Sequence, residues 1–318
     1  MIRRLARLRT SIAAGISPTL GILAQHDPHP LFVPAWYLRS AAPDPAPRIT
    51  VVTPSLDQGA FIARTVESVL AQDYPNLDYV IRDGGSSDDT MARLERYRPR
   101  LGAVHSAPDG GQGAAINAGF AATDGELMCW LNADDVLLPG SLAYVARYFA
   151  RHPKVDVLYG NRVVIDEFDR EVGTWVLPPH HPESIRWVDF IPQECTFWRR
   201  SLWNRCGPLD EDLHFALDWD LWRRFEAGGA RFAHTRRFLA GFRRHGDQKT
   251  NFDAGEALPE RAFSEIERVG ERWNGIAVTI QEAHLRSQPY RLRAVPARIR
   301  ERALDQVRQP RVPVYFPP

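Results

Sequence analysis

The stretch Leu127-Met-Cys-Trp-Leu-Asn-Ala-Asp-Asp-Val-Leu-Leu-Pro-Gly140 is the part of the sequence that indicates the fold. It opens as an apolar run of strand length, breaks into Asn-Ala-Asp-Asp, and continues as a second short apolar run that Pro-Gly ends. A buried strand that ends in Asp134 and Asp135 brings negative charge to the carboxyl edge of a sheet, where open α/β folds bind ligands. A simple turn in which Asp134 or Asp135 caps the next helix is the alternative interpretation.

Two adjacent carboxylates are costly to hold together unless water, a helix terminus or a cation compensates their charge. A divalent cation that is held by one or two carboxylates and completed by substrate phosphates meets this requirement. The stretch is therefore consistent with a cation site as well as with a capped turn.

The composition describes a cytoplasmic protein with one large domain, or one domain with extensions. The chain has 318 residues, of which 44% are hydrophobic and 25% are charged. The net charge of +1 gives no indication of a nucleic-acid partner. Cys129, Cys195 and Cys206 have no metal-binding spacing, which suits buried thiols in a reducing compartment. No apolar run reaches membrane-spanning length.

Residues 1–48 are expected to form an N-terminal extension and linker. Ile2, Leu5 and Leu8 lie at helical spacing among arginines, which gives a short basic amphipathic segment. Such a segment can lie on an anionic membrane surface, and a locally packed terminal helix is the alternative. The proline-rich run 41–47 predicts an extended linker.

The region 49–160 alternates between β-rich runs and segments with helical periodicity. This alternation predicts an α/β fold with a mainly parallel central sheet flanked by helices. The expected strands are 49–53, 77–81, a short strand near 104, 127–131 and 155–159, and the expected helices are 60–72, 87–98 (with Ser87 as N-cap), 114–122 and 141–152.

Two polar segments follow strands of this region. Asp83 comes at the end of a strand and before two glycines, where a sharp turn can leave its carboxylate pointing into a cleft. The run 109–113 is rich in glycine and precedes a helix, so its backbone N–H groups can face a phosphate. A dinucleotide-binding motif is excluded because Ile116 occupies the position of its last glycine.

The second half of the chain has a different pattern. We expect a hairpin around 166–170, an aromatic strand within 190–198, a helix that begins near Asp218 and Asp220, a strand at 239–245, and a helical, basic C-terminal extension over 251–318. The two acids can be dipole-favoured residues of a first helical turn. Tryptophans 175, 187, 198 and 203 offer faces for sugar rings, although core packing is the more frequent use of tryptophan.

Five segments occur in an order that is typical of one family. They are Ile49-Thr-Val-Val-Thr-Pro-Ser, Asp83-Gly-Gly-Ser-Ser-Asp-Asp-Thr, Asp109-Gly-Gly-Gln-Gly-Ala-Ala-Ile-Asn-Ala-Gly, Trp130-Leu-Asn-Ala-Asp-Asp and Asp218-Trp-Asp-Leu-Trp. Together they resemble the family 2 glycosyltransferases, which have the A-type (GT-A) nucleotide-sugar-binding fold. The resemblance covers roughly residues 49–250.

The resemblance implies a role for each matched residue. Asp134 would hold the Mn²⁺ or Mg²⁺ that bridges the donor diphosphate, and Asp218 would be the general base for the acceptor hydroxyl. His245 is a candidate further metal ligand, with a surface histidine as the alternative. The expected nucleotide-binding residues are Thr53, Pro54, Ser55, Asp83, Gly113, Asn117, Asn132 and Asp134.

The chain departs from the family pattern at three points. Asn132 replaces the first acid of the Asp-x-Asp motif, which puts its direct contact with the metal in doubt. Leu217 replaces the Glu that often precedes the base. The Gln-x-x-Arg-Trp motif of processive members is missing after Asp218, which argues for the addition of one sugar per encounter.

The sequence thus predicts an inverting, non-processive, metal-dependent glycosyltransferase. The resemblance implies a nucleotide-diphosphate sugar donor, with a UDP-sugar expected, and a saccharide or lipid-linked acceptor in polysaccharide biosynthesis. Residues 49–160 would bind the nucleotide, and 161–250 would bind the acceptor and carry the base. The alternative is a non-catalytic nucleotide-sugar-binding or scaffold protein of the same fold. A nucleotidyltransferase is disfavoured because 55–59 lacks its basic, glycine-rich loop.

Overall fold

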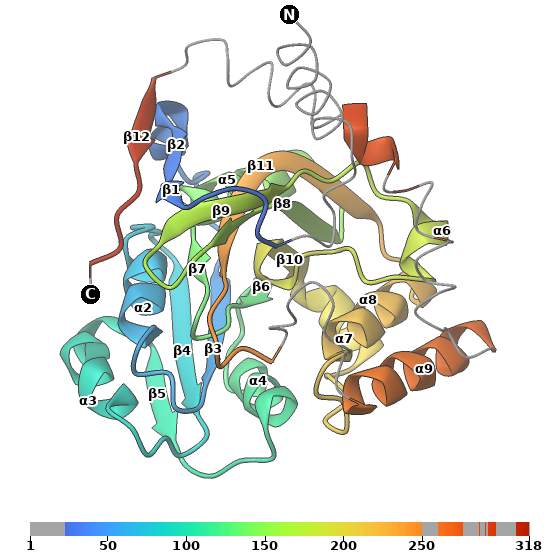
Figure 1. Cartoon of the computed structure of the whole chain (residues 1–318), viewed down its shortest axis with the longest axis horizontal. Helices are drawn as coiled ribbons and strands as arrows, with labels where there is room; N and C mark the ends of the chain where they lie inside the picture. The colour runs from blue at the N-terminus through green and yellow to red at the C-terminus, as the bar shows by residue number, and fades with distance from the viewer. Residues whose placement is uncertain are drawn as a thin grey trace, which may run out of the picture.

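A computed structural model describes residues 23–249, 260–275, 286, 290, 292–296 and 310–317. Its centre is a ten-stranded mixed sheet in which the strands follow the order β1-β9-β8-β10-β6-β3-β4-β5, and β11 pairs with both β7 and β8 (Figure 1). The basic segment predicted at residues 2–9 lies outside the described residues, as does much of the basic tail. Among the residues that are described, no helix combines the length and apolarity needed to cross a membrane.

The first half of the sheet is parallel, as predicted. Its strand β3 is buried at every position, which fits its β-branched, apolar sequence. Helices alternate with these strands, and α4 packs on β3 and β4. The strands are β3 (Ile49–Ser55), β4 (Leu77–Asp83), β5 (Ala103–Ser106) and β6 (Leu127–Trp130), and the helices are α2 (Ile62–Leu70), α3 (Thr90–Leu94), α4 (Gln112–Ala121) and α5 (Ser141–Arg151).

The second half of the sheet is mostly antiparallel. Strand β10 pairs antiparallel with both β6 and β8, and so joins the two halves. The predicted hairpin is formed by β8 and β9, and β11 runs parallel to β8. The strands are β7 (Val136–Leu137), β8 (Val157–Ile165), β9 (Arg170–Trp175), β10 (Thr196–Arg199) and β11 (Phe232–Arg243).

Several predicted elements differ from the structure. The strand expected at 239–245 begins earlier, at Phe232, and ends at Arg243, and the strand expected at 155–159 continues to Ile165. The helix expected from Ser87 begins only at Thr90, because the Ser87 N–H donates to the Asp57 carboxylate at 2.7 Å. The helix then continues as a 3₁₀ turn, η2 (Glu95–Arg100). The aromatic strand expected within 190–198 is reduced to β10, because η3 (Gln193–Cys195) occupies its middle.

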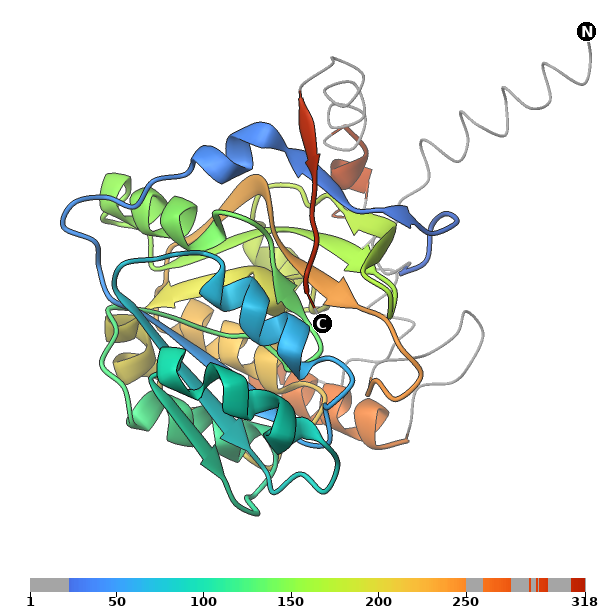
Figure 2. The same ribbon diagram turned by 90° about the vertical axis from the view of Figure 1, so that its left-hand side faces the viewer.

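The segment before the linker packs against the domain. Residues Leu31, Val33 and Tyr37 are each 2% exposed and contact a small apolar cluster that includes Val136 and Phe316. Strand β12 pairs with β2 in a separate two-stranded sheet, so both ends of the described chain meet there (Figure 2). The elements are β1 (His29–Pro30), β2 (Phe32–Pro34), η1 (Ala35–Arg39) and β12 (Arg311–Pro313).

Tryptophans fill the core between the sheet and the later helices. Trp130, Trp198 and Trp222 are fully buried and lie within 6.0 Å of one another, measured between ring centroids. Trp203 packs against Phe120 in the same cluster. Trp198 and Trp203 therefore do not offer faces to a sugar, and core packing is the correct interpretation for both.

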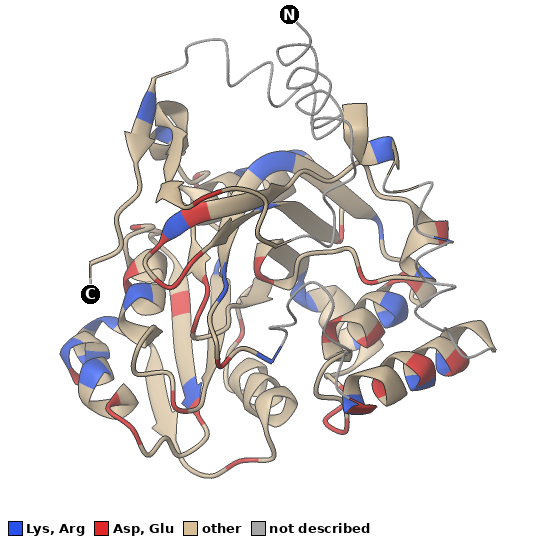
Figure 3. Cartoon of the chain, viewed as in Figure 1, with Lys and Arg blue, Asp and Glu red and all other residues tan. Residues whose placement is uncertain are grey.

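The later helices lie together beside the sheet, with α9 against α8 (Figure 1). Acidic and basic residues are interspersed along α9 (Figure 3). The hydrophobic stripe of α9 faces the domain, and its Val269 is fully buried. These helices are α6 (Pro182–Ile185), α7 (Arg200–Cys206), α8 (Leu217–Ala227) and α9 (Glu260–Asn274).

Candidate active site

The Asn-Ala-Asp-Asp segment forms a tight loop between β6 and β7 at the carboxyl edge of the parallel strands. Helix α2 supports this loop, since Thr65 Oγ1 lies 2.7 Å from the carbonyl oxygen of Ala133 and 2.8 Å from that of Asp135. Helix α5 begins after Gly140 without a side-chain cap. The alternative in which Asp134 or Asp135 caps this helix is therefore wrong.

The two carboxylates of the loop lie in different environments. Asp135 is 1% exposed and accepts a hydrogen bond from the Arg243 N–H at 2.9 Å. Burial, followed by the charges of Asp134 and Glu194, raises the pKa of Asp135 well above its usual range. The Asp134 side chain is 16% exposed and faces His245, with Oδ2 and Nε2 at 3.0 Å. Asp134 is thus the carboxylate that is available at the edge.

His245 reaches Asp134 because β11 pairs antiparallel with β7, which follows the loop. The imidazole packs on the Phe61 ring at 4.4 Å, and the histidine side chain is 4% exposed. The alternative of a surface histidine is therefore wrong.

This pair fits a divalent cation. Adjacent ligands of a six-coordinate cation with bonds of about 2.1 Å lie about 3 Å apart, close to the observed separation of the two ligand atoms. In this structure His245 Nε2 donates a hydrogen bond to the Asp134 carboxylate, and Nδ1 is buried without a partner among the described residues. A cation bound between the two residues would replace the proton on Nε2, and Nδ1 would carry the remaining one. Two protein ligands leave the remaining positions to water and substrate oxygens.

Asn132 contacts a polar chain rather than Asp134. Its Oδ1 accepts a hydrogen bond from Gln112 Nε2 at 2.8 Å, and Gln112 Oε1 accepts one from Lys249 Nζ at 2.9 Å. Burial lowers the pKa of Lys249, and the nearby Asp134 carboxylate opposes this effect by favouring the charged ammonium. These contacts bring the Lys249 ammonium and the N-terminus of α4 to the same edge. No role was predicted for Gln112 or Lys249.

Ser55 and Asp83 lie opposite each other at the ends of β3 and β4. Ser55 Oγ is buried without a hydrogen-bond partner among the described residues. The Asp83 carboxylate accepts hydrogen bonds from the Ser86 N–H at 3.0 Å and from Ser106 Oγ at 2.6 Å. Thr53 differs from the expectation, because it is fully buried and its hydroxyl is 3.1 Å from Tyr79 Oη.

Gly113 and Asn117 face a neighbouring loop instead of the strand ends. Asn117 donates to the Leu209 carbonyl at 3.0 Å and to the Glu211 carboxylate at 2.8 Å, and it accepts the Leu209 N–H at 2.9 Å. A Cβ at Gly113 would lie 3.4 Å from Glu211 Cα. Both residues therefore hold the loop before α8, which is a different contact from the nucleotide binding that was predicted.

A second pair of carboxylates lies at the start of α8. Asp218 accepts the Trp219 N–H at 2.9 Å and shares a hydrogen bond with Asp189. Burial raises the pKa of Asp218, and burial together with the Asp218 carboxylate raises the pKa of Asp189 well above its usual range. The two carboxyl groups therefore titrate as a pair that shares a proton, which Asp189 holds the more strongly. Asp189 comes from the loop after α6, and no local pattern marked it in the sequence.

A buried ion pair lies near both pairs of carboxylates. Arg162 donates to Glu194 through Nε at 2.7 Å and Nη2 at 2.6 Å, and its guanidinium lies 4.5 Å from the ring centroids of both Trp175 and Phe242. The Arg162 charge favours the ionised forms of Asp135, Asp189 and Asp218. Arg162 thus connects the strand-end loop electrostatically with the start of α8.

Helix α9 fixes the start of α8. The Glu265 carboxylate accepts the N–H groups of His214, Phe215 and Ala216 at 2.8, 2.6 and 3.3 Å. This interaction satisfies donors that precede the helix and places negative charge at its positive end. The turn that carries Asp218 is therefore held by a residue from outside the predicted glycosyltransferase region.

The position of Asp220 in α8 differs from what helical spacing predicts. A residue two positions from an inward-facing Asp218 should face solvent or cap the helix, yet Asp220 is fully buried. It accepts hydrogen bonds from Arg224 at 2.9 Å, Arg272 at 2.9 Å and Trp273 at 2.9 Å. Because α9 covers the opposite face of α8, both faces of the first turn are buried.

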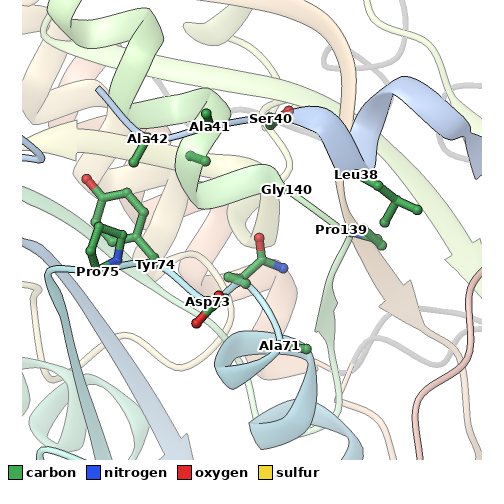
Figure 4. Close-up of a pocket in the computed structure, with 12 residues that line it drawn as sticks. Leu38, Ser40, Ala41, Ala42, Ala71, Asp73, Tyr74, Pro75, Pro139 and Gly140 are labelled. Carbon is green, nitrogen blue, oxygen red and sulfur yellow. The ribbon is translucent and has the colours of Figure 1, made fainter. Parts of the chain in front are cut away.

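A separate pocket of about 480 Å³ lies away from these residues (Figure 4). It is formed by the linker at Ser40–Ala42, the end of α2 and the turn at Pro139 and Gly140. Pro75 in its wall precedes β4, so the pocket lies towards the amino ends of the parallel strands. Its lining has one ionisable side chain that is charged at neutral pH, Asp73, and it lacks the groups for sugar transfer.

Comparison with known proteins identifies the family. Residues 50–202 match the sequence profile described as glycosyl transferase family 2. This region is a family 2 glycosyltransferase domain, and the chain is a glycosyltransferase. A "PGL/p-HBAD biosynthesis glycosyltransferase" of Mycobacterium tuberculosis is 28% identical over 179 residues, which are 55% of this chain and 68% of that protein.

Two solved structures have a similar fold. TarS of S. aureus in complex with UDP-GlcNAc has a TM-score of 0.58 at 19% identity, over 74% of this chain and 69% of that chain. The mannosyltransferase PcManGT from Pyrobaculum calidifontis, in complex with GDP-Man and Mn²⁺, has a TM-score of 0.50 at 20% identity, over 85% and 82% of the two chains. The predicted GT-A fold is confirmed.

Proposed function

We propose that this glycosyltransferase moves one sugar per encounter from a nucleoside diphosphate, with a UDP-sugar as the expected donor, to a hydroxyl of a saccharide or lipid-linked acceptor. One observation carries the proposal. At the ligand-binding edge of the sheet the half-buried Asp134 carboxylate lies 3.0 Å from the His245 imidazole, and Asp218 and Asp189 form a buried carboxylate pair, with the Arg162 charge acting on this second pair and on Asp135 next to Asp134.

The first pair is suited to the donor diphosphate. Asp134 and His245 would hold Mn²⁺ or Mg²⁺, which supplies Lewis-acid stabilisation of the leaving phosphates when it is bound. The Lys249 ammonium and the N–H groups at the start of α4 add positive charge at the same edge. Gly111 has a φ of 104° and open space around its Cα, so backbone can approach a phosphate closely there.

The second pair is suited to the acceptor. The Asp218 carboxylate would take the proton of the acceptor hydroxyl as its oxygen bonds to the anomeric carbon, while the bond from that carbon to the phosphate oxygen breaks. Direct attack opposite the leaving group gives inversion. Asp189 would remain protonated and donate its hydrogen bond to Asp218, which keeps the base ionised despite its burial.

The nucleoside would lie at the ends of β3 and β4, next to Pro54, Ser55 and Asp83. The hydroxyl of Ser55, which has no hydrogen-bond partner in the described part of the chain, is a donor and acceptor for such a ligand. The two solved structures hold different nucleotides, UDP-GlcNAc and GDP-Man. The choice of UDP is therefore part of the proposal.

The two halves of the sheet would have different functions. Residues 49–160 bind the nucleotide and 161–250 contribute the acceptor site and base, while 251–318 support them through α9.

We further propose a cytoplasmic enzyme that associates peripherally with anionic membrane in polysaccharide biosynthesis. Deletion of residues 1–22, which leaves the packed segment from Leu31 to Tyr37 in place, should release it from anionic vesicles at low salt; absence of vesicle binding by the intact chain would contradict this.

The experiment is a donor screen of the full chain. Each nucleotide sugar is incubated with and without Mn²⁺, and release of the nucleoside diphosphate is measured first without acceptor and then with candidate glycans. We expect turnover of one donor class that excess chelator abolishes. Asp124→Asn is the matched control, because the Asp124 side chain is 76% exposed and pairs only with the exposed Arg48 among the described residues. Metal-independent turnover would overturn the proposal.

A further inference from the structure

A cluster of ligand-type side chains lies at the sheet edge formed by β1 and β9, where β1 runs along β9 (Figure 1). His29 and Glu171 are opposite each other in this antiparallel pair. The Nε2 atoms of His26 and His29 lie 3.8 and 3.9 Å from Glu171 Oε1. Within the described ranges, these are the only three His, Cys, Asp or Glu residues whose ligand atoms all lie within 4.8 Å of one another.

Backbone contacts fix which imidazole nitrogen is available. His26 Nδ1 lies 3.0 Å from the carbonyl oxygen of Asp27, and His29 Nδ1 lies 3.1 Å from that of Pro30. A carbonyl oxygen only accepts hydrogen bonds, so each Nδ1 carries the proton and each neutral ring has its lone pair on Nε2. Both lone pairs are therefore on the nitrogens that face Glu171. Metal-binding histidines are commonly held by such a contact.

The two rings stack, with centroids 4.6 Å apart and planes inclined by 8°. An imidazole lone pair lies in its ring plane, so the two Nε2 lone pairs run side by side, and a shared cation would require the rings to turn until both planes contain it. Two protonated imidazoles would repel each other at this distance, whereas two neutral ones can share a cation. The histidines are exposed and Glu171 is half-buried, so the carboxylate is fixed while a coordination position stays open to water.

We propose that His26, His29 and Glu171 form a second metal site, which binds Zn²⁺ or a similar transition-metal ion apart from the active site. Two imidazoles and one carboxylate suit Zn²⁺, whereas Mg²⁺ prefers oxygen ligands. Tetrahedral ligands at about 2.0–2.1 Å lie about 3.3 Å apart. The two Nε2–Oε1 separations therefore need to close by about half an ångström, and the imidazoles need to rotate so that both lone pairs point at the ion.

The site would fasten the N-terminal segment to the domain. Residues just before it already follow β9, since the Gln25 N–H donates to the Val172 carbonyl at 2.8 Å and Gln25 Nε2 donates to that of Thr174 at 2.9 Å. Gly173 is required there, because a Cβ would lie 2.5 Å from the Leu23 carbonyl oxygen. A metal ion at His26, His29 and Glu171 would add a further link between the N-terminal segment and β9, next to these hydrogen bonds.

The test uses the full chain with the active-site ligand removed. The His245→Ala variant is stripped with chelator, and Zn²⁺ is titrated by calorimetry, with Co²⁺ absorption as a second readout of coordination. We expect one Zn²⁺ per chain, at least tenfold weaker binding after Glu171→Gln or His29→Ala, and no change after the matched control His152→Ala, which alters an exposed histidine outside the cluster. Zinc should also raise Tm in a Glu171-dependent way.

Two results would overturn the site. One is an absence of stoichiometric Zn²⁺ binding by the His245→Ala chain. The other is Zn²⁺ binding that Glu171→Gln and His29→Ala leave unchanged, provided that circular dichroism and metal-free Tm match those of the parent. Donor turnover by the Glu171→Gln variant, made on its own, should equal that of the unaltered chain, so this test stands apart from the sugar-transfer proposal.

Discussion

Two pairs of carboxylates contrast in how the fold uses them. Asp134 and Asp135 are neighbours in the sequence, yet one faces the edge of the sheet and the other is buried beneath it. Asp189 and Asp218 are far apart in the sequence, yet they share a hydrogen bond. The fold thus places two neighbouring acids in different environments and brings two distant acids into contact.

The contrast assigns a different chemistry to each pair. An exposed carboxylate next to an imidazole can bind a cation, whereas two buried carboxylates that share a proton can supply a base. Both sites depend on parts of the chain beyond the family match at 50–202, because His245 of the first site, Asp218 of the second and α9 all follow it. The predictions below test whether the two pairs act separately.

The largest effect is expected at the strand-end pair. Asp134→Ala removes the exposed carboxylate and should lower turnover by roughly a thousandfold or more, because charge on the leaving diphosphate would lose its stabilisation. Nucleoside diphosphate release is the measurement, with Asp124→Asn as control. Turnover within tenfold of the unaltered enzyme would assign the donor to another site.

Asp218→Asn should lower kcat by roughly two to four orders of magnitude while donor affinity stays nearly intact. The amide keeps the shape of the side chain and removes its basicity. Steady-state kinetics with varied donor and acceptor separate the two effects. Normal turnover by this variant would mean that the base lies elsewhere.

Asp189 is expected to change the pH dependence of activity. Activity needs ionised Asp218, so it should fall as pH drops through the raised pKa of this carboxyl. Asp189→Leu removes a hydrogen bond to the ionised form, which raises this pKa further and should move the acidic limb of kcat/KM up by about one pH unit. Asp189→Asn retains a donor and should leave the limb in place. Identical profiles for both variants would exclude the positioning role.

Asp220 should affect stability more than chemistry. Asp220→Ala leaves Arg224, Arg272 and Trp273 without their shared acceptor, which should lower the free energy of unfolding by about 2–3 kcal/mol. Urea unfolding measures this loss, and kcat at a temperature where the variant is folded should change by less than tenfold. A kcat loss like that of Asp218→Asn would exchange the roles of the two acids.

The smallest effect is expected at Asn132. Its Oδ1 already accepts a hydrogen bond from Gln112, so we expect it to act around the metal ligands without binding the cation. Asn132→Asp should therefore change Mn²⁺ affinity by less than about tenfold. Calorimetric titration of Mn²⁺ in the presence of nucleoside diphosphate measures this, and a much larger gain would make residue 132 a direct ligand.

The sequence predicted the elements whose signals are local. The strand expected at 127–131 and the hairpin at 166–170 appear where their patterns indicated. Thr53 could not be assigned a face, since β3 is buried on both sides and lacks alternation. Asp220 was misjudged because helical spacing does not reveal that α9 packs against α8.

The parts of the site that were missed come from tertiary contacts. Asp189, Arg162 and Glu194 lie in segments without a recognisable motif, and their importance follows only from which charges they meet. Lys249 and Gln112 belong to matched or neighbouring segments, but their hydrogen bond joins residues far apart in the chain. Long-range pairing of polar groups has no periodicity that a single sequence can reveal.

The most direct measurement of the division between the two pairs is nucleoside diphosphate binding by calorimetry. The unaltered chain, Asp134→Ala and Asp218→Asn are each titrated with UDP, with and without Mn²⁺. We expect Mn²⁺-dependent binding of similar affinity in the unaltered chain and Asp218→Asn, and its loss in Asp134→Ala. Mn²⁺-dependent binding that survives Asp134→Ala, or that disappears with Asp218→Asn, would contradict the assignment of donor and base to separate carboxylate pairs.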